Sequence, residues 1–166
     1  KLASYNVFAT KEYMSRVRGG MNSTSIRIGS VPVRAPVNQV DILIPLNTGA
    51  LSHVESRLSD QTLILADKET LGVDLDRTTC KSIDVPFTRI ASEIGNKIYS
   101  NVVAVGAIAG LFGIELKTAS QYVERFFAGK TEDVVQKNLA ALKAGFDRGA
   151  SLAKSSKFNF DIAADA

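Results

Sequence analysis

Two short apolar runs, residues 41–46 and 61–66, most constrain how this chain can fold. Continuous apolar runs of about four to eight residues indicate strands that are covered on both faces, which is typical of parallel sheets. Segments with helical spacing follow these runs, so strands and helices alternate along the sequence. This alternation predicts an α/β fold: a three-layer α/β/α sandwich with a mixed, mostly parallel sheet.

The sheet is expected to be mixed because a β-hairpin precedes the apolar runs. Residues 25–28 alternate polar and apolar side chains, as a half-exposed strand does. Gly29 and Ser30 then turn the chain into residues 31–33, where Pro32 has no N–H to donate and predicts an edge strand. Two further short strands are predicted over residues 5–9 and 82–86.

Helices account for most of the remainder. One is predicted from Asn47 or Thr48, either of which can serve as its N-cap, to about Leu58. A short helix is predicted over residues 87–94, and longer ones start near Ser100, Thr118 and Thr131. The aromatic side chains on these helices are expected in the core. Asp67 is expected at the carboxyl end of the second apolar strand.

The helical pattern is lost after Arg148. We therefore divide the sequence into an α/β domain, residues 1–150, and a linker or docking arm, residues 151–166, that leads to a following domain. The chain begins inside a predicted strand and ends in this arm. We expect either an excerpt of a longer polypeptide or a chain with disordered ends.

Composition excludes several classes of function. The 166 residues favour one domain, and 20 basic against 17 acidic residues give a net charge of only +3. The basic residues are scattered, so no nucleic-acid partner is expected. No run reaches the ~18 apolar residues of a membrane helix, and no signal peptide is visible, so we expect no membrane partner and a cytoplasmic location.

The sequence also offers little for catalysis or for metal binding. Cys80 is the only cysteine, which excludes an internal disulfide and a cysteine cluster for zinc or iron–sulfur. His53 is the only histidine, so we expect it to have a structural or surface role. We therefore assign no catalytic residue and no metal ligand to this chain.

Residues 15–20, Ser-Arg-Val-Arg-Gly-Gly, form the best candidate binding site. In an extended segment Arg16 and Arg18 would project from the same face. Two guanidiniums on one side suit a dianionic or phosphorylated group, because each can bond bidentately. Gly19 and Gly20 allow close approach of the backbone. The alternative is a solvated edge followed by a hairpin turn, and the spacing alone leaves both open.

These residues, together with residues 5–13 before them, resemble the γ domain of the 2-oxoacid:ferredoxin oxidoreductases, the family of the pyruvate and 2-oxoglutarate enzymes. The resemblance continues to about Arg148. The Ser-Arg-x-Arg-Gly-Gly form is similar to γ domains fused to the front of an α subunit, most commonly in 2-oxoglutarate enzymes. Further similar segments are residues 25–28, 40–47, 101–107, 127–130, 135–138 and 144–146.

The resemblance implies a concrete chemistry for the whole enzyme. A 2-oxoacid is decarboxylated on thiamine pyrophosphate with Mg²⁺, electrons pass through iron–sulfur clusters to ferredoxin, and the acyl group passes to coenzyme A. The γ domain is implied to be non-catalytic, to bind none of these cofactors alone, and to cover the active site on the thiamine-binding domains or subunits. It is implied to accommodate coenzyme A or an anion through Arg16, Arg18, Gly19, Gly20 and Asn47.

The family's γ domain begins with a glycine-rich loop after its first strand, and this sequence lacks that loop, which would precede Lys1. Two other functions stay open. One is an independent anion- or nucleotide-binding α/β module without a redox partner. The other is a small stand-alone enzyme, but nothing in the sequence pairs Cys80 with His53.

Overall fold

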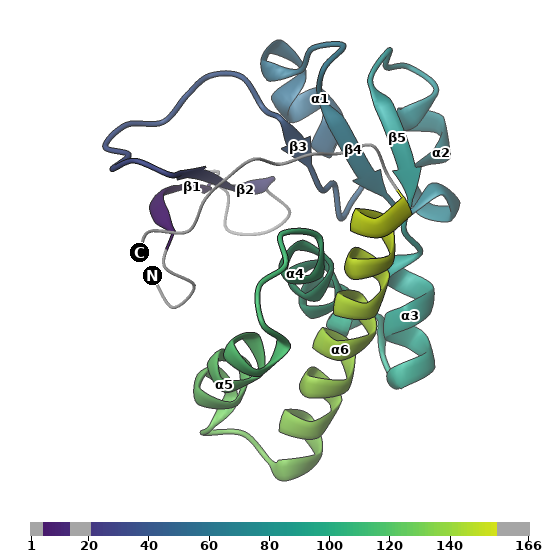
Figure 1. Ribbon diagram of the computed structural model, residues 1–166. Helices are drawn as coiled ribbons and strands as arrows, with labels where there is room; N and C mark the ends of the chain where they lie inside the picture. Colours follow the sequence, from purple (N-terminus) through teal and green to yellow (C-terminus); the bar gives the residue numbers. More distant parts are fainter. Residues whose placement is uncertain (1–4, 14–20, 156–166) are drawn as a thin grey trace. The chain divides into compact units, whose positions relative to one another are not determined.

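A computed structural model describes residues 5–13 and 21–155 (Figure 1). The chain forms two compact units that are interleaved in the sequence. The first unit holds the described residues up to Leu65 and also Leu71–Ile83. The second unit holds Ala66–Thr70 and the described residues from Asp84 onward.

A long antiparallel hairpin opens the first unit. Strand β1 (Asn6–Tyr13) pairs with β2 (Asn22–Gly29), and the register runs from Asn6 opposite Gly29 to Tyr13 opposite Asn22. The predicted strand at 25–28 is confirmed, but its predicted partner is wrong. Residues 31–33 form no strand, because β1 supplies the hydrogen-bonding partners of β2.

The first unit also contains a three-stranded sheet in the order β3 (Ile42–Leu43), β4 (Leu63–Ala66), β5 (Lys81–Asp84). Strand β3 runs parallel to β4, and every residue of β4 is buried, as its apolar run predicts. Strand β3 is shorter than predicted. Pro45, which follows it, cannot donate to a ladder.

Short helices connect these strands. Helix α1 (Ala50–Val54) and the 3₁₀ helix η1 (Glu55–Arg57) lie between β3 and β4, and α2 (Lys68–Leu75) lies between β4 and β5. The sequence pattern does not indicate α2. The α/β class, with a parallel strand pair and an antiparallel hairpin, is confirmed, although the five strands form two sheets rather than one.

The second unit is helical. It contains α3 (Phe87–Ile94), the 3₁₀ helix η2 (Lys97–Tyr99), α4 (Ser100–Leu111), α5 (Leu116–Phe127) and α6 (Glu132–Ser155). The predicted bounds of α3 and the predicted start of α4 are confirmed. No helix in the described part of the chain is both long and apolar enough to span a membrane.

Two sequence predictions fail in this unit. Helix α6 continues past Arg148 to Ser155, because Gly145, Gly149 and Leu152 stay on one buried face. The aromatic residues of α5 are not all in the core. Tyr122 and Phe126 are 51% and 68% exposed, and only Val123 is buried on that helix.

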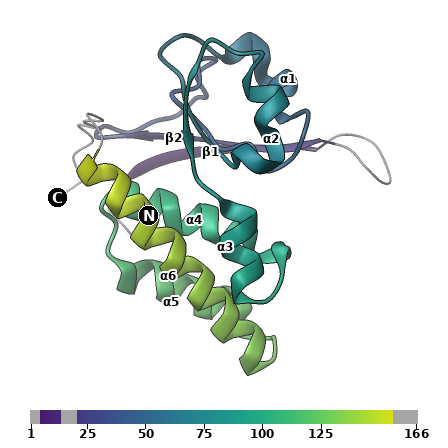
Figure 2. The ribbon, with the colours of Figure 1, turned by 90° about the vertical axis from the view of Figure 1, so that its right-hand side faces the viewer.

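Glycines let α4 and α6 lie side by side with their backbones in contact (Figures 1 and 2). Gly106 and Gly110 on α4 face α6, and Gly145 and Gly149 on α6 face α4. A Cβ on Gly145 would lie 2.0 Å from the carbonyl oxygen of Val103. Any side chain at these four positions would therefore force the helices apart.

Two aspartates at strand ends cap helices: Asp67 caps α3, and Asp84 caps α2. Asp67 follows β4, and its Oδ2 accepts a hydrogen bond from Thr88 N–H at the start of α3 (2.9 Å). Asp84 ends β5, and its Oδ1 accepts a hydrogen bond from Lys68 N–H at the start of α2 (3.1 Å). Each carboxylate thus satisfies an N–H that its helix leaves unpaired.

Candidate functional site

Four of the five predicted binding residues, Arg16, Arg18, Gly19 and Gly20, lie outside the described residues. The last described pair on the strands that lead to them is Tyr13 opposite Asn22. This end of the hairpin, with the polar residues around it, is therefore the described part of the candidate site.

Three polar side chains share one half-buried face of β2. Ser23, Ser25 and Arg27 are half-buried and alternate with exposed residues, as the two-residue period of a strand requires. Glu12 on β1 stands opposite Ser23. The Ser23 hydroxyl donates a hydrogen bond to Oε2 of Glu12 over 2.8 Å, which orients the carboxylate.

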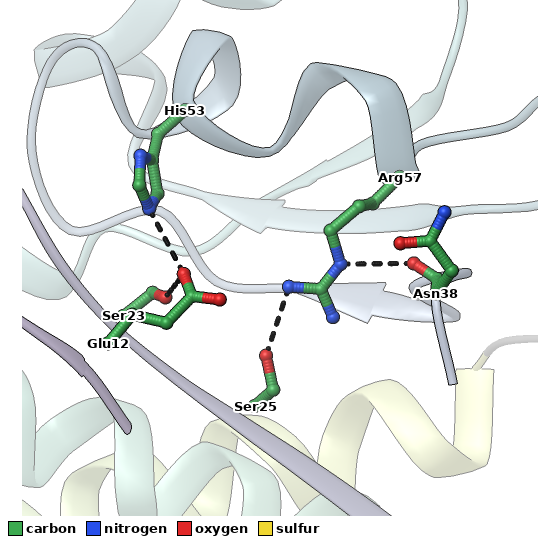
Figure 3. A network of polar contacts seen from close by, with 6 residues as sticks. All are labelled: Glu12, Ser23, Ser25, Asn38, His53 and Arg57. Carbon is green, nitrogen blue, oxygen red and sulfur yellow. Dashed lines mark hydrogen bonds and ion pairs between the residues drawn. The ribbon is translucent and has the colours of Figure 1, made fainter. Parts of the chain in front are cut away.

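His53 on α1 meets the same carboxylate oxygen (Figure 3). Its Nε2 lies 3.4 Å from Oε2 of Glu12, and the two side chains are 26% and 56% exposed. The Ser23 hydroxyl, followed by His53, lowers the pKa of Glu12 below its ordinary value. Glu12 is therefore an anion at neutral pH and ties the hairpin to α1.

Arg57, at the end of η1, contacts the hairpin at Ser25, two residues beyond Ser23 on β2 (Figure 3). Its Nη1 donates to Ser25 Oγ over 3.1 Å, and its Nε donates to the carbonyl oxygen of Asn38 over 3.0 Å. Its own carbonyl oxygen accepts the N–H of Val40 over 3.1 Å. Arg57 thus joins β2 to the segment that leads into β3.

Asn47, the fifth predicted binding residue, is exposed in the turn before α1. The prediction that Asn47 or Thr48 is the N-cap of that helix is wrong. Gly49 holds this position with a φ of 82°, which glycine adopts without strain, and its N–H donates to Oδ2 of Asp74 over 3.1 Å. The backbone N–H of His53 donates to the carbonyl oxygen of Gly49. The loop that contains Asn47 therefore leads directly into the first turn of α1, which ends at His53.

The arrangement does not suit nucleophilic catalysis. A catalytic triad places histidine between the hydroxyl and the carboxylate, whereas here Glu12 lies between Ser23 and His53. The Cys80 thiol donates to the carbonyl oxygen of Ser59 over 3.1 Å. Among residues 5–13 and 21–155, no three His, Cys, Asp or Glu side chains could hold a metal ion together.

Sequence reasoning misses Glu12, Ser23 and Arg57. The pairing of β1 with β2 brings Glu12 opposite Ser23, and the wrong hairpin partner hides that register. His53 is expected to have a structural or surface role, and it contacts Glu12 at a half-buried position.

The chain is similar to two proteins of Archaeoglobus fulgidus. It is 22% identical over 155 residues to "2-oxoglutarate synthase subunit KorC", covering 92% of this chain and 77% of that protein. It is 26% identical over 172 residues to "Indolepyruvate oxidoreductase subunit IorB", covering 90% of this chain and 83% of that protein.

Two solved structures share the fold. The keto/oxoacid ferredoxin oxidoreductase gamma subunit from Geobacter sulfurreducens matches with a TM-score of 0.66 and 23% identity, over 90% of this chain and 86% of that one. The 2-oxoglutarate:ferredoxin oxidoreductase from Magnetococcus marinus, with 2-oxoglutarate, coenzyme A and succinyl-CoA bound, matches with a TM-score of 0.79 and 24% identity. That match covers 99% of this chain and 28% of the solved chain.

A family model settles the relationship. The family described as "Pyruvate ferredoxin/flavodoxin oxidoreductase" matches residues 1–148, which confirms the resemblance found in the sequence. This chain belongs to the pyruvate ferredoxin/flavodoxin oxidoreductase family and is part of an enzyme of that family.

Proposed function

We propose that this chain is a non-catalytic γ domain of a 2-oxoacid:ferredoxin oxidoreductase, fused to the front of an α subunit of the 2-oxoglutarate type. It covers the active site of a cytoplasmic holoenzyme and accommodates coenzyme A. The family match over residues 1–148 carries this proposal. The similarity to a 2-oxoglutarate synthase subunit and to a 2-oxoglutarate:ferredoxin oxidoreductase supports the choice of 2-oxoglutarate.

In this proposal coenzyme A meets Arg16, Arg18, Gly19, Gly20 and Asn47. Guanidinium groups suit phosphates because they are planar, permanently charged and able to form paired hydrogen bonds. The exposed Asn47 adds an amide that can donate or accept. The hairpin register supports the assignment, because Tyr13 and Asn22 pair directly on either side of the segment that carries the two arginines.

The family's cofactors belong, in this proposal, to partner domains or subunits. Of the predicted docking arm, residues 151–155 are part of α6, and residues 156–166 lie outside the described residues. The described residues do not fit these groups. The single cysteine cannot supply the thiolates of an iron–sulfur cluster, and its thiol donates a hydrogen bond to the backbone carbonyl oxygen of Ser59. One oxygen of Asp67 and one of Asp84 accept helix N–H groups, and Oδ1 of Asp67 is buried without a hydrogen-bond partner. This chain therefore contributes binding surface, and the thiamine-binding domains contribute the chemistry and pass electrons to ferredoxin.

The test is steady-state kinetics of the holoenzyme with Arg16→Ala and Arg18→Ala. A charged hydrogen bond contributes about 1.5–3 kcal/mol, so we expect the KM for coenzyme A to rise roughly tenfold or more. Decarboxylation of the 2-oxoacid, followed without coenzyme A, should be preserved. Lys143→Ala is the matched control, because it removes an exposed positive charge from α6. An unchanged KM in both arginine variants would exclude this role.

A further inference from the structure

Helix α5 presents an aromatic face to solvent. The rings of Tyr122 and Phe126 stack with their centroids 6.1 Å apart, and the ring of Phe127 meets that of Phe126 edge to face at 4.9 Å. Tyr122 is 51% exposed and Phe126 is 68% exposed. We call these three residues the α5 aromatic face. Contiguous exposed apolar side chains mark a surface that another molecule covers.

The helix that carries this face is held at both ends but buries little. Val123 is the only buried residue of α5, and a helix of 12 residues is marginal in water on its own. Before α5, the Ile114 N–H donates to the carbonyl oxygen of Ala109 over 2.9 Å, and after it the Lys130 N–H donates to that of Phe127 over 2.9 Å. The aromatic side chains therefore project from a fixed backbone whose burial a partner would complete.

The charged residues around this face are mostly positive. Three exposed cations lie within residues 116–130: Lys117, Arg125 and Lys130. Glu124 is the only acidic residue in that range, and none of the three cations forms an ion pair with a described residue. On α6, by contrast, two lysines each pair with an aspartate four residues away. The complementary surface is therefore apolar at its centre and acidic at its edge.

We propose that the α5 aromatic face docks on another domain or subunit of the same enzyme, at an apolar surface edged by carboxylates. This inference rests on the proposed function, in which the chain covers the thiamine-binding domains. The solved 2-oxoglutarate enzyme supports this choice of partner, because the match covers only 28% of that chain and leaves most of it outside the similar part. Aromatic residues and arginine are enriched in interface cores, so Tyr122 and Phe126 serve as the anchors and Arg125 meets a carboxylate.

The first test compares hydroxyl-radical oxidation of Tyr122 and Phe126 in the 166-residue chain alone and in the holoenzyme. We expect both rates to fall about fivefold or more in the holoenzyme, as exposed fractions of 51% and 68% fall to those of buried side chains. Tyr99, which is 8% exposed, is the control and should react slowly in both samples. Equal rates for Tyr122 and Phe126 in the two samples would overturn the inference.

The second test uses variants of the holoenzyme. Phe126→Ser should return the oxidation rate of Tyr122 to that of the chain alone. Ile98→Ser is the matched control, because Ile98 is also 68% exposed but lies on η2, and it should leave Tyr122 protected. Arg125→Glu should weaken the protection, whereas Lys143→Glu on α6 should not. Thermal unfolding of the chain alone should be unchanged in all four, since each replaced side chain is exposed. Full protection of Tyr122 in Phe126→Ser would contradict the proposal.

Other occupants of this face give different results. If Tyr122 becomes protected in the chain alone as its concentration rises, the face binds a second copy and the inference is wrong. Protection by phosphatidylserine vesicles would assign the face to a lipid surface and would also refute the inference. If Arg16→Ala raises the KM for coenzyme A while Tyr122 stays unprotected, only this inference fails. If the chain does not purify with thiamine-binding domains, the proposed function fails and this inference fails with it.

Discussion

At the scale of single residues, the hairpin network makes a charge-dependent contact. The hydrogen bond from the Ser23 hydroxyl is the largest cause that lowers the pKa of Glu12, and the contact with His53 is the next largest. A carboxyl whose pKa is lower in the folded chain stabilises it above the ordinary pKa, and this contribution is lost as the pH falls through the lowered value.

This gives a prediction for the acid range. Wild type and Glu12→Gln should differ in hairpin hydrogen exchange at neutral pH, with slower exchange in wild type. The difference should begin to shrink as the pH falls below the ordinary carboxyl pKa of 4.5, and it should disappear once the pH is below the lowered pKa, where Glu12 is protonated. A difference that persists unchanged into strong acid would show that the carboxylate charge is not responsible.

Asp67 makes a second prediction at this scale. It is 4% exposed, and its Oδ2 accepts the Thr88 N–H at the start of α3. Asp67→Ala should lower the free energy of unfolding by about 1 kcal/mol, the usual cost of losing a cap. Asp67→Asn keeps an acceptor oxygen and should recover most of the loss. Urea denaturation of the three proteins measures this, and equal losses in both variants would rule out capping as the cause.

At the scale of elements, the crossing of α4 and α6 depends on backbone contact. A Cβ on Gly145 would meet the Val103 carbonyl oxygen at 2.0 Å, so Gly145→Ala must move one helix. We expect a loss of about 1–3 kcal/mol, the usual range for overpacking. Gly72 on α2 is the control, because a Cβ there would meet nothing within 4 Å and alanine should stabilise the chain by about 0.5–1 kcal/mol. Thermal unfolding of the two variants should move in opposite directions.

The elements that are predicted best from the sequence are those whose spacing of apolar residues is enough to identify the element and its buried side. The run at 61–66 gives β4, and the periodic segment at 87–94 gives α3. The hairpin partner could not be predicted in the same way, because β1 and residues 31–33 both have strand-like patterns and only pairing distinguishes them. The end of α6 is hard to predict because two glycines, Gly145 and Gly149, form most of its buried face there, and Leu152 is the one large apolar side chain buried beside them.

The candidate site was predictable only in part. The resemblance identified the family, and Asn47 was placed at a turn between a strand and a helix. The contact of Glu12 with His53 joins residues that are far apart in the sequence, and only tertiary structure brings them together. Local patterns carry no information on such a pair.

At the scale of the whole molecule, this chain is one part of an enzyme. We expect the purified 166-residue chain to show no oxidation of 2-oxoglutarate or pyruvate with a viologen acceptor, and no bound iron or thiamine pyrophosphate. The reason is that its one cysteine cannot hold a cluster, and the Ser23, Glu12 and His53 network is not arranged for proton transfer to a nucleophile. Turnover above background that is lost with Cys80 or His53 variants would refute this.

The interleaving of the two units also determines how this chain can be divided. A cut between Leu65 and Ala66 divides the first unit, because it separates the residues up to Leu65 from Leu71–Ile83. The second of these segments contains most of β5, which belongs to the same sheet as β4. A cut between Ile83 and Asp84 instead separates Ala66–Thr70 from the rest of the second unit. That segment contains Asp67, which caps α3. Neither unit is a single continuous segment of the sequence. Recombination between related genes can therefore exchange the two only together, and a chimera joined at either point inherits an incomplete sheet or an uncapped helix.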